Sequence, residues 1–269
     1  MKTTKRILTL GIAISLSCTS AFAQINPQPT KVSHAEPLFQ DLVRDLGARK
    51  GEKEFNIGAE FSSKKDFREY GYLAEYEFAP FNRLGLEIET DFSFFSPKSN
   101  STQDKIPANR LEGIRFSAQY TFFVSEKTKT SMALGYTQIL ELTDFKNYRK
   151  DKLLTGLVYS PFLVVAKKWG SNIHTLVYAY PMIQQHFGES GTPVDWQINT
   201  SAMYSLPGSG HFIGMEVNQE IIAGKMSVTL RPQIKTKLNS HLAVGIVTGI
   251  PVANRDENVS SFFRLIIEP

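Results

Sequence analysis

The sequence predicts an all-β protein, an antiparallel transmembrane β-barrel of about 12 strands. Three observations favour this fold. Apolar and polar residues alternate with a period of two from Glu54 to the C-terminus. Along the chain, short connections between these segments alternate with a second set of connections, most of which are longer. A leader typical of exported proteins precedes them.

The first 23 residues have the pattern of a cleavable signal peptide. Residues 2–6 include three basic side chains, residues 7–17 are apolar, and Ala21-Phe22-Ala23 fits a cleavage site before Gln24. Eleven apolar residues are too few for a membrane-spanning helix, which needs about 20. An alternative is a lipoprotein leader with Cys18 as the lipidated residue, but Ser15 stands where a large aliphatic residue is expected.

The composition limits the class of protein. Removal of the three basic residues of the leader leaves 27 basic residues against 26 acidic ones, a net charge of +1. This balance does not favour a nucleic-acid partner. Cys18 is the only cysteine, so we expect neither disulfides nor thiolate metal sites in the mature chain. The mean hydropathy of −0.19 is too low for a bundle of membrane helices.

Residues 24–50 are expected to form a periplasmic linker and one short amphipathic helix. The stretch 24–33 is polar and contains prolines, as linkers often do. From 36 to 46 the apolar spacing is helical, Pro37 fits the first turn and Gly47 fits the end. Such a short helix must dock to be stable, at the periplasmic mouth or inside the lumen. Its docking face would be Leu38, Leu42 and Leu46.

Residues 51–269 are expected to form the barrel domain. Alternating segments of about ten residues match tilted transmembrane strands, which need about 9–11 residues. Twelve such segments lie at about 54–62, 68–79, 83–95, 110–123, 130–141, 153–168, 172–185, 196–206, 211–220, 225–238, 241–250 and 260–268.

If the aromatic faces meet lipid, the opposite faces point into the lumen. The predicted lumen or pore-lining residues are Glu60, Glu75, Glu77, Glu87, Glu89, Asp91, Arg115, Glu216, Glu220, Arg231, Lys235, Lys237 and Arg264. Such charges must be solvated or paired. Two readings remain open: a water-filled pore that selects solutes, or a filled lumen in which ion pairs hold the barrel together.

A soluble β-barrel or β-sandwich would show the same periodicity, with its aromatic face inside. The connections argue for the membrane. Short turns are expected around Pro80–Asn82, Val124–Lys129, Trp169–Ser171, Pro207–Gly210 and Asn239–Ser240. The alternate set is Ser63–Phe67, Ser96–Asn109, Leu142–Lys152, His186–Asp195, Ile221–Gly224 and Pro251–Val259. Short turns on one rim and longer loops on the other are typical of outer-membrane barrels, with both termini in the periplasm.

Enzymatic chemistry has weaker support. The same-face pairs Glu75/Glu77 and Glu87/Glu89 could split their pKa values for acid–base work, but solvated lumen acids that face bases on another strand are the simpler explanation. His186, Glu189 and Ser190 share one outer loop without a catalytic motif. His174 is expected at the rim. No histidines stand at metal-ligand spacing and no glycine-rich phosphate loop is present, so we expect no catalytic residues, cofactor or metal.

The stretch HAEPLFQDLVRDLGARKGEKEFNIG, residues 34–58, resembles the N-terminal signature of the HAEPLYID family of bacterial outer-membrane β-barrel proteins. The match includes His34 to Leu38 and Asp41, with Phe39 in place of Tyr and Gln40 in place of Ile. GLEIE at 85–89 is also similar. The motif covers about a tenth of the chain. The resemblance implies an outer-membrane barrel and supplies no activity, substrate or site residues.

These observations favour a porin-like channel for small polar solutes in the bacterial outer membrane, surrounded by lipid. One alternative is an outer-membrane hydrolase that modifies lipid or lipopolysaccharide. Another is a structural or adhesive barrel without turnover. The oligomeric state and the solute stay open.

Overall fold

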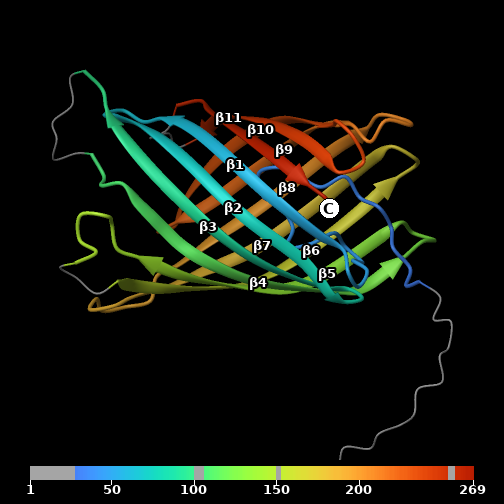
Figure 1. The fold of residues 1–269 in the computed structure, drawn as a ribbon, viewed down its shortest axis with the longest axis horizontal. Helices are drawn as coiled ribbons and strands as arrows, with labels where there is room; N and C mark the ends of the chain where they lie inside the picture. The colour runs from blue at the N-terminus through green and yellow to red at the C-terminus, as the bar shows by residue number, and fades with distance from the viewer. Residues whose placement is uncertain (1–27, 100–105, 150–152, 254–257) are drawn as a thin grey trace, which may run out of the picture.

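The chain forms a closed antiparallel barrel of twelve strands in a computed structural model, which describes residues 28–99, 106–149, 153–253 and 258–269 (Figure 1). Each strand pairs with its neighbours in sequence, and β1 pairs with β12 to close the wall. All twelve predicted strands are confirmed. They are β1 Lys53–Ser63, β2 Phe67–Phe81, β3 Leu84–Pro97, β4 Arg110–Ser125, β5 Thr130–Leu142, β6 Leu154–Trp169, β7 Ile173–His186, β8 Val194–Ser205, β9 Phe212–Ile222, β10 Lys225–Lys237, β11 Leu242–Ala253 and β12 Ser260–Ile267.

The outer surface of the barrel is apolar and its interior is polar. In β1, Ile57 points outward and is 43% exposed, whereas its neighbour Asn56 points inward and is fully buried. The same alternation exposes aromatic side chains such as Tyr72 and Phe116 on other strands. A soluble barrel would bury these rings. The reversed arrangement therefore identifies a transmembrane barrel, with lipid as the outer solvent. Within the described part of the chain, no helix has the length and apolarity needed to cross a bilayer.

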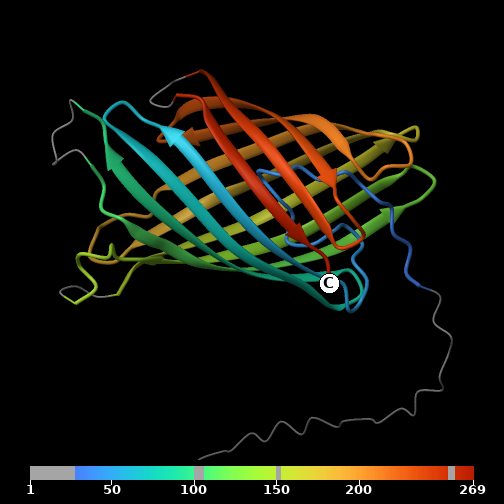
Figure 2. The ribbon, with the colours of Figure 1, turned by 45° about the horizontal axis from the view of Figure 1, so that its top comes forward.

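The two rims of the barrel differ. One rim, here called the short-turn end, carries the connections 82–83, 126–129, 170–172, 206–211 and 238–241. The opposite rim, the long-loop end, includes the connections 98–109 and 143–153. Both described chain ends lie on the short-turn side (Figure 2).

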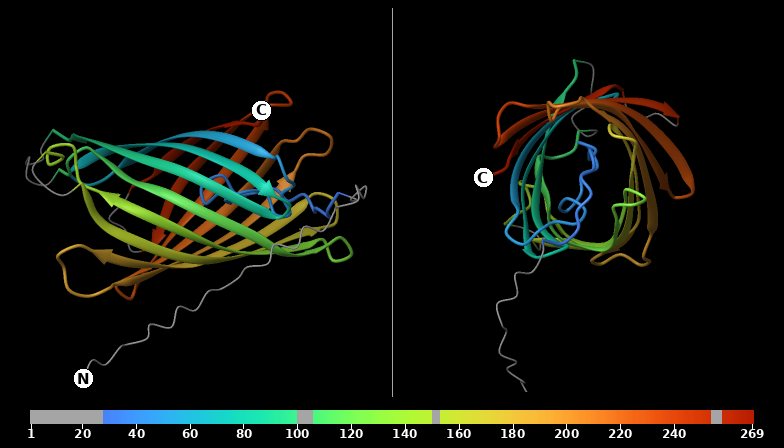
Figure 3. Two further views of the ribbon diagram at one scale, coloured as in Figure 1. Left: turned by 60° about the horizontal axis from the view of Figure 1, so that its bottom comes forward. Right: turned by 90° about the vertical axis from the view of Figure 1, so that its right-hand side faces the viewer.

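Residues 31–47 lie inside the barrel and are called the lumen loop. The loop enters at the short-turn end and returns to the same end before β1 begins (Figure 3). Lys31 and Gly47 are neighbours, since a Cβ placed on Gly47 would lie 3.5 Å from the Cα of Lys31. The prediction of a helix over 36–46 is wrong, because this stretch consists of bends and turns.

The pairing of β6 with β7 is interrupted in the middle of the wall, and that of β10 with β11 has a shorter gap between Leu230↔Ile250 and Gln233↔Val247. The β6–β7 pairing runs to Tyr159↔Ile183 and resumes at Leu163↔Ala179. Pro161 lies in this gap on β6, opposite Pro181 on β7. Proline has no N–H to donate, so the seam loses part of its hydrogen-bond ladder in the middle of the wall.

Candidate functional site: the lumen

Apolar side chains of the lumen loop anchor it to two different parts of the wall. Leu42, Val43 and Leu46 pack into a buried cluster with residues of β5, β6 and β7, including Phe162. Leu38 packs into a second cluster with residues of β8, β9, β11 and β12. The three leucines predicted to dock, Leu38, Leu42 and Leu46, are each no more than 2% exposed. They do not share one helical face, because the loop reaches two walls of the barrel.

Hydrogen bonds from the wall explain why the loop is not helical. The backbone N–H of Leu38 donates to Gln233 Oε1 at 2.6 Å, and that of Gln40 donates to Glu216 Oε1 at 3.2 Å. Three more contacts act in the same way: Ala35 N–H donates to His174 Nδ1, Gly47 N–H donates to Thr121 Oγ1, and Gln119 Nε2 donates to the Arg44 carbonyl. The wall thus replaces the hydrogen bonds that a helix would supply to its own backbone.

Charged side chains connect the loop to β1, β2 and β12. The buried guanidinium of Arg44 donates to Glu54 at 3.0 Å and to Glu77 at 2.9 Å. Asp41 forms an ion pair with Arg264, a side chain only 2% exposed that also lies 3.7 Å from Glu75. Carboxylate oxygens of Asp41, Glu54 and Glu77 come within 4.8 Å of one another, a spacing that could hold a cation. Arg44 already supplies positive charge to two of them.

An ion-pair cluster joins the two ends of the loop. Lys31 Nζ lies 2.7 Å from Asp45 and 2.8 Å from Glu52. Burial opposes the charge of Lys31, but these carboxylates hold its pKa above the ordinary value. Burial likewise opposes ionisation of Asp45, yet Arg44 and Lys31 lower its pKa to about 2. The ends of the loop therefore stay charged and paired at neutral pH.

Two wall glycines make room for the loop. A Cβ on Gly85 of β3 would lie 2.5 Å from the Cβ of Arg44, and one on Gly245 of β11 would lie 2.7 Å from a methyl group of Leu38. The first neighbour is next to the backbone and could not swing aside. At Gly85 only a residue without a side chain allows the close approach, whereas at Gly245 a Cβ would push the end of the Leu38 side chain aside.

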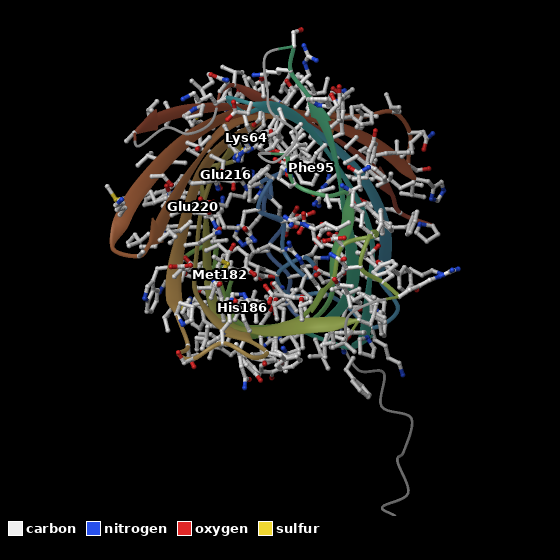
Figure 4. The ribbon with its side chains drawn as sticks, turned by 90° about the vertical axis from the view of Figure 1, so that its left-hand side faces the viewer. Lys64, Phe95, Met182, His186, Glu216 and Glu220 are labelled. Carbon is white, nitrogen blue, oxygen red and sulfur yellow. The ribbon has the colours of Figure 1, made fainter. Side chains whose placement is uncertain are left out.

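Between the lumen loop and the long-loop end, the barrel encloses a cavity of about 320 Å³, here called the vestibule. Phe39, Gln40, Asp41 and Val43 of the loop form its floor, and strands from around the barrel form its walls. Viewed from the long-loop end, Glu220 and Met182 lie along one wall, and the lumen loop crosses the barrel behind them (Figure 4). A charged cavity at this depth is the part of the molecule suited to hold a solute.

The structure brings most of the predicted lumen residues together. Eight line the vestibule: Glu60, Glu75, Glu87, Glu89, Asp91, Arg115, Glu220 and Arg264. Lys235 and Lys237 line a second cavity of about 350 Å³ at the short-turn end, beneath the loop. The other three face inward and are buried: Glu77 bonds Arg44, Glu216 bonds Gln40, and Arg231 stacks on Phe39, with its guanidinium carbon 3.2 Å from the ring centroid.

Several residues that line the vestibule or hold the lumen loop were not predicted from the sequence. Tyr178, Tyr180 and Met182 of β7 line the vestibule, although aromatic side chains were expected to face lipid. The hydroxyl oxygen of Tyr180 lies 2.6 Å from Gln197 Oε1 and 2.8 Å from Gln40 Oε1, so its one O–H joins the wall to the loop through either amide. His174, expected at the rim, is the second residue of β7 at the short-turn end, where it faces inward, is 4% exposed and accepts the Ala35 N–H.

The residues weighed for catalysis are held in structural contacts. The side chains of Glu75 and Glu77 accept hydrogen bonds from Asn56. His186 Nε2 lies 3.3 Å from Glu141, and Nδ1 lies 3.6 Å from Glu189. In the described ranges no hydrogen bond joins His186 to a serine, so the geometry does not assemble a nucleophile and a base.

The family model described as HAEPLYID-like matches residues 30–268. The chain belongs to this family. The match extends the similarity from the motif at 34–58 to nearly the whole barrel. Within the HAEPLYID-like chain, residues 34–47 of this motif lie in the lumen loop and residues 53–58 lie in β1. A comparison with curated proteins finds no match.

Solved structures with a similar fold are outer-membrane channels. The COG4313 outer membrane channel from Pseudomonas putida F1 superposes with a TM-score of 0.66 at 11% identity, covering 84% of this chain and 98% of that chain. The KdgM porin superposes with a TM-score of 0.51 at 14% identity, covering 80% of this chain and 97% of that one. These similarities establish the fold. Together with the apolar outer surface, the fold and the family place the protein in the bacterial outer membrane.

Proposed function

We propose that this HAEPLYID-like protein is a porin-like channel for small polar solutes, constricted in its periplasmic half by the lumen loop. The observation that carries the proposal is the vestibule, a cavity inside a closed barrel whose wall presents acidic and basic side chains. Charged groups around a cavity of this kind interact with hydrated solutes and not with lipid. The signal-peptide pattern and the position of both described ends support an orientation with the short-turn end in the periplasm.

The lumen loop divides the interior into two cavities. The vestibule lies on its outer side, and the cavity lined by Lys235 and Lys237 lies on its periplasmic side. A solute must pass the loop to go from one to the other. We therefore expect the docked loop to set a low conductance and its release to raise the conductance.

Single-channel recording in planar bilayers tests the proposal, with Leu42→Glu as the loop variant. Leu42 is 1% exposed in an apolar cluster, so an ionised side chain there costs several kcal/mol and should release the loop. We expect intact protein to show small steps and Leu42→Glu to show steps several-fold larger. Leu153→Glu, at an exposed position next to β6, is the matched control and should behave like the wild type.

The outcomes separate the functions that the sequence left open. Absence of conductance in both the wild type and Leu42→Glu, with each variant inserted and folded, rules out the channel. A conductance that is the same in all three proteins would show that the loop is not the constriction. Lipid hydrolysis by the purified wild type would favour the hydrolase alternative.

A further inference from the structure

The long-loop end carries a group of aromatic side chains on its outer face, here called the aromatic patch. Phe61 of β1 contacts Tyr70 of β2, with ring centroids 5.5 Å apart. Tyr70 is the cross-strand partner of Phe94 on β3, whose ring centroid lies 6.3 Å from that of Phe145. Phe61, Phe94 and Phe145 are all exposed. The patch therefore extends the lipid-facing surface of the wall up to its rim.

Part of the β5–β6 connection, residues 143–149, folds against the outside of the wall. The Phe145 N–H donates to the Asn109 carbonyl at 3.0 Å, which fixes this segment beside β4. Phe94 points outward from β3, so its contact with Phe145 places the segment over the outer surface. Tyr148 is also exposed and extends the patch, with its ring centroid 5.4 Å from that of Phe145. Exposed rings in this position fit the membrane interface, where aromatic side chains meet both lipid and water.

Basic side chains accompany the aromatic patch on its rim side. Four of them are exposed: Lys65, Arg68, Lys146 and Arg149. Arg68 shares the outer face of β2 with Tyr70, and its Cα lies about 7 Å nearer the rim, because two strand residues rise by about that distance. Lys146 and Arg149 each follow directly after an aromatic residue of the patch. The order of rings and then positive charge matches the order of acyl chains and then headgroup in a lipid.

The acids close to these basic side chains are bonded to other groups. Asp144 accepts hydrogen bonds at 2.8 Å from the backbone N–H of Lys146 and from the side-chain amide of Asn147. Glu69 lies 4.0 Å from Lys64. Within the described ranges, no ion pair joins a carboxylate to any of the four exposed basic side chains. Their charge is therefore available to an anion, and phosphate is the anion that such groups bind well.

We propose that this rim is a docking site for the phosphorylated glucosamine headgroup of lipopolysaccharide in the outer leaflet. The four basic side chains bind its phosphates, and Phe94, Phe145 and Tyr148 contact its sugars and the first methylenes of its acyl chains. The proposal goes beyond the channel function and uses from it only the orientation, with the long-loop end outside. Attraction of anionic solutes to the channel mouth is the competing explanation of the charge.

Native mass spectrometry of the purified full-length protein in a neutral detergent tests the binding. The probe is bisphosphorylated lipid A, the membrane anchor of lipopolysaccharide. It is compared with the same lipid after removal of both phosphates and with phosphatidylglycerol. We expect lipid A to bind about tenfold more tightly than either, because only lipid A offers two phosphates to the rim. Equal binding of the dephosphorylated lipid, or of phosphatidylglycerol, overturns the proposal.

A pair of charge substitutions assigns the phosphate-binding groups. Arg68→Gln with Lys146→Gln should weaken lipid A binding about thirtyfold, from about fivefold for each basic side chain near an anionic lipid surface. Arg49→Gln with Lys127→Gln removes the same charge from exposed positions at the short-turn end and should change nothing. Because all four side chains are exposed, both proteins should keep the heat-modifiable migration of a folded barrel. Equal loss of binding in the two proteins would mean that only overall charge matters, which overturns the proposal.

Tyr148→Ala tests the aromatic contact. It should weaken lipid A binding about fivefold, the effect of about 40 Å² of ring surface covered by the lipid. Tyr204→Ala, at an exposed position of β8 near the short-turn end, is the control and should bind as the wild type does. Equal binding by all three proteins would overturn the role of the rings.

Reversal potentials in a KCl gradient separate lipid docking from attraction of solutes. We expect Arg68→Gln with Lys146→Gln to leave the reversal potential unchanged. A shifted potential with undiminished lipid A binding would show that the charges act on solutes, and it overturns the docking site. Lipid A binding by a protein that shows no conductance would instead overturn the channel function and leave the docking site.

Discussion

Gly85 of β3 lies directly against Arg44 of the lumen loop, and a Cβ there would come within 2.5 Å of the Arg44 Cβ. Because that atom is next to the backbone, Gly85→Val should displace the loop at a cost of about 1–3 kcal/mol, the usual range for overpacking. We expect proteolysis to cut residues 31–47 in this variant while the barrel stays folded. Gly71→Ala is the control, since its nearest neighbour, Glu60 Cβ, would be 3.3 Å away. Equal protection of the loop in both variants would argue against a tight fit at Gly85.

Docking of the loop depends on pH through His34 and Glu36, whose contributions change in opposite directions as the pH rises. Burial, with His174 and Lys168 nearby, lowers the pKa of His34 from 6.5 to about 4 when the loop is docked. The undocked loop therefore binds a proton more readily, and docking weakens as the pH falls below 6.5. Burial and then Asp45 raise the pKa of Glu36 from 4.5 to about 8, so docking weakens as the pH rises above 4.5.

Adding the two contributions predicts the tightest docking between about pH 4.5 and 6.5, with weaker docking on both sides. An environment-sensitive dye on a Ser33→Cys variant would follow the transition, since Ser33 is exposed at the entrance of the loop. His34→Gln should weaken the acidic limb without changing the alkaline one, and Glu36→Gln should weaken the alkaline limb without changing the acidic one. A profile that neither substitution changes would mean that other groups control docking.

At the scale of the strands, the β6–β7 seam is a weak place in the described wall, with the longer of the two gaps in pairing. Its pairing breaks between Tyr159↔Ile183 and Leu163↔Ala179, where Pro161 and Pro181 remove two donors. We expect amide hydrogens in 160–162 and 180–182 to exchange about tenfold faster than those in 164–166, because local opening there breaks fewer bonds. Pro181→Ala should slow exchange in this seam. Uniform protection along β6 and β7 would contradict the assignment.

The strands could be predicted from the sequence and the loop could not. Each strand shows its own period of two, which fixes which side chains face lipid. In the loop, the four-residue spacing of Leu38, Leu42 and Leu46 fits a helix as well as it fits the irregular loop that is observed. What decides against the helix is a set of hydrogen-bond partners far along the chain, among them Thr121 and Gln233. No local pattern contains that information.

The candidate site could likewise be predicted only in part from the sequence. The charged residues of the vestibule could be predicted because the lipid-facing side of a membrane strand rarely carries acids or bases. Charged side chains on such a strand are therefore expected to face the lumen. Tyr178, Tyr180 and Met182 were not, because an aromatic or thioether side chain on a strand fits lipid as well as a cavity. Which residues share one cavity depends on how the twelve strands are staggered, and single segments do not show this.

At the scale of the whole molecule, the membrane determines which substitutions are tolerated. Ile246 lies near the middle of β11 and is 51% exposed on the outer surface. Ile246→Lys should lower the free energy of unfolding in bilayers by about 2–4 kcal/mol, as a lysine does near the bilayer midplane. Urea titration followed by heat-modifiable gel migration measures the change. Leu238→Lys, in the exposed β10–β11 turn, should be nearly neutral. If both substitutions cost the same, Ile246 does not face the hydrocarbon layer.

The two ends of the lumen loop meet at one rim, joined by Lys31, Asp45 and Glu52. The chain therefore folds back inside the barrel and does not thread through it. Withdrawing residues 31–47 breaks no strand pair and requires no seam to part, so the interior can be emptied and refilled while the wall stays closed. The same topology lets the barrel close around an empty lumen during assembly and take up its loop afterwards.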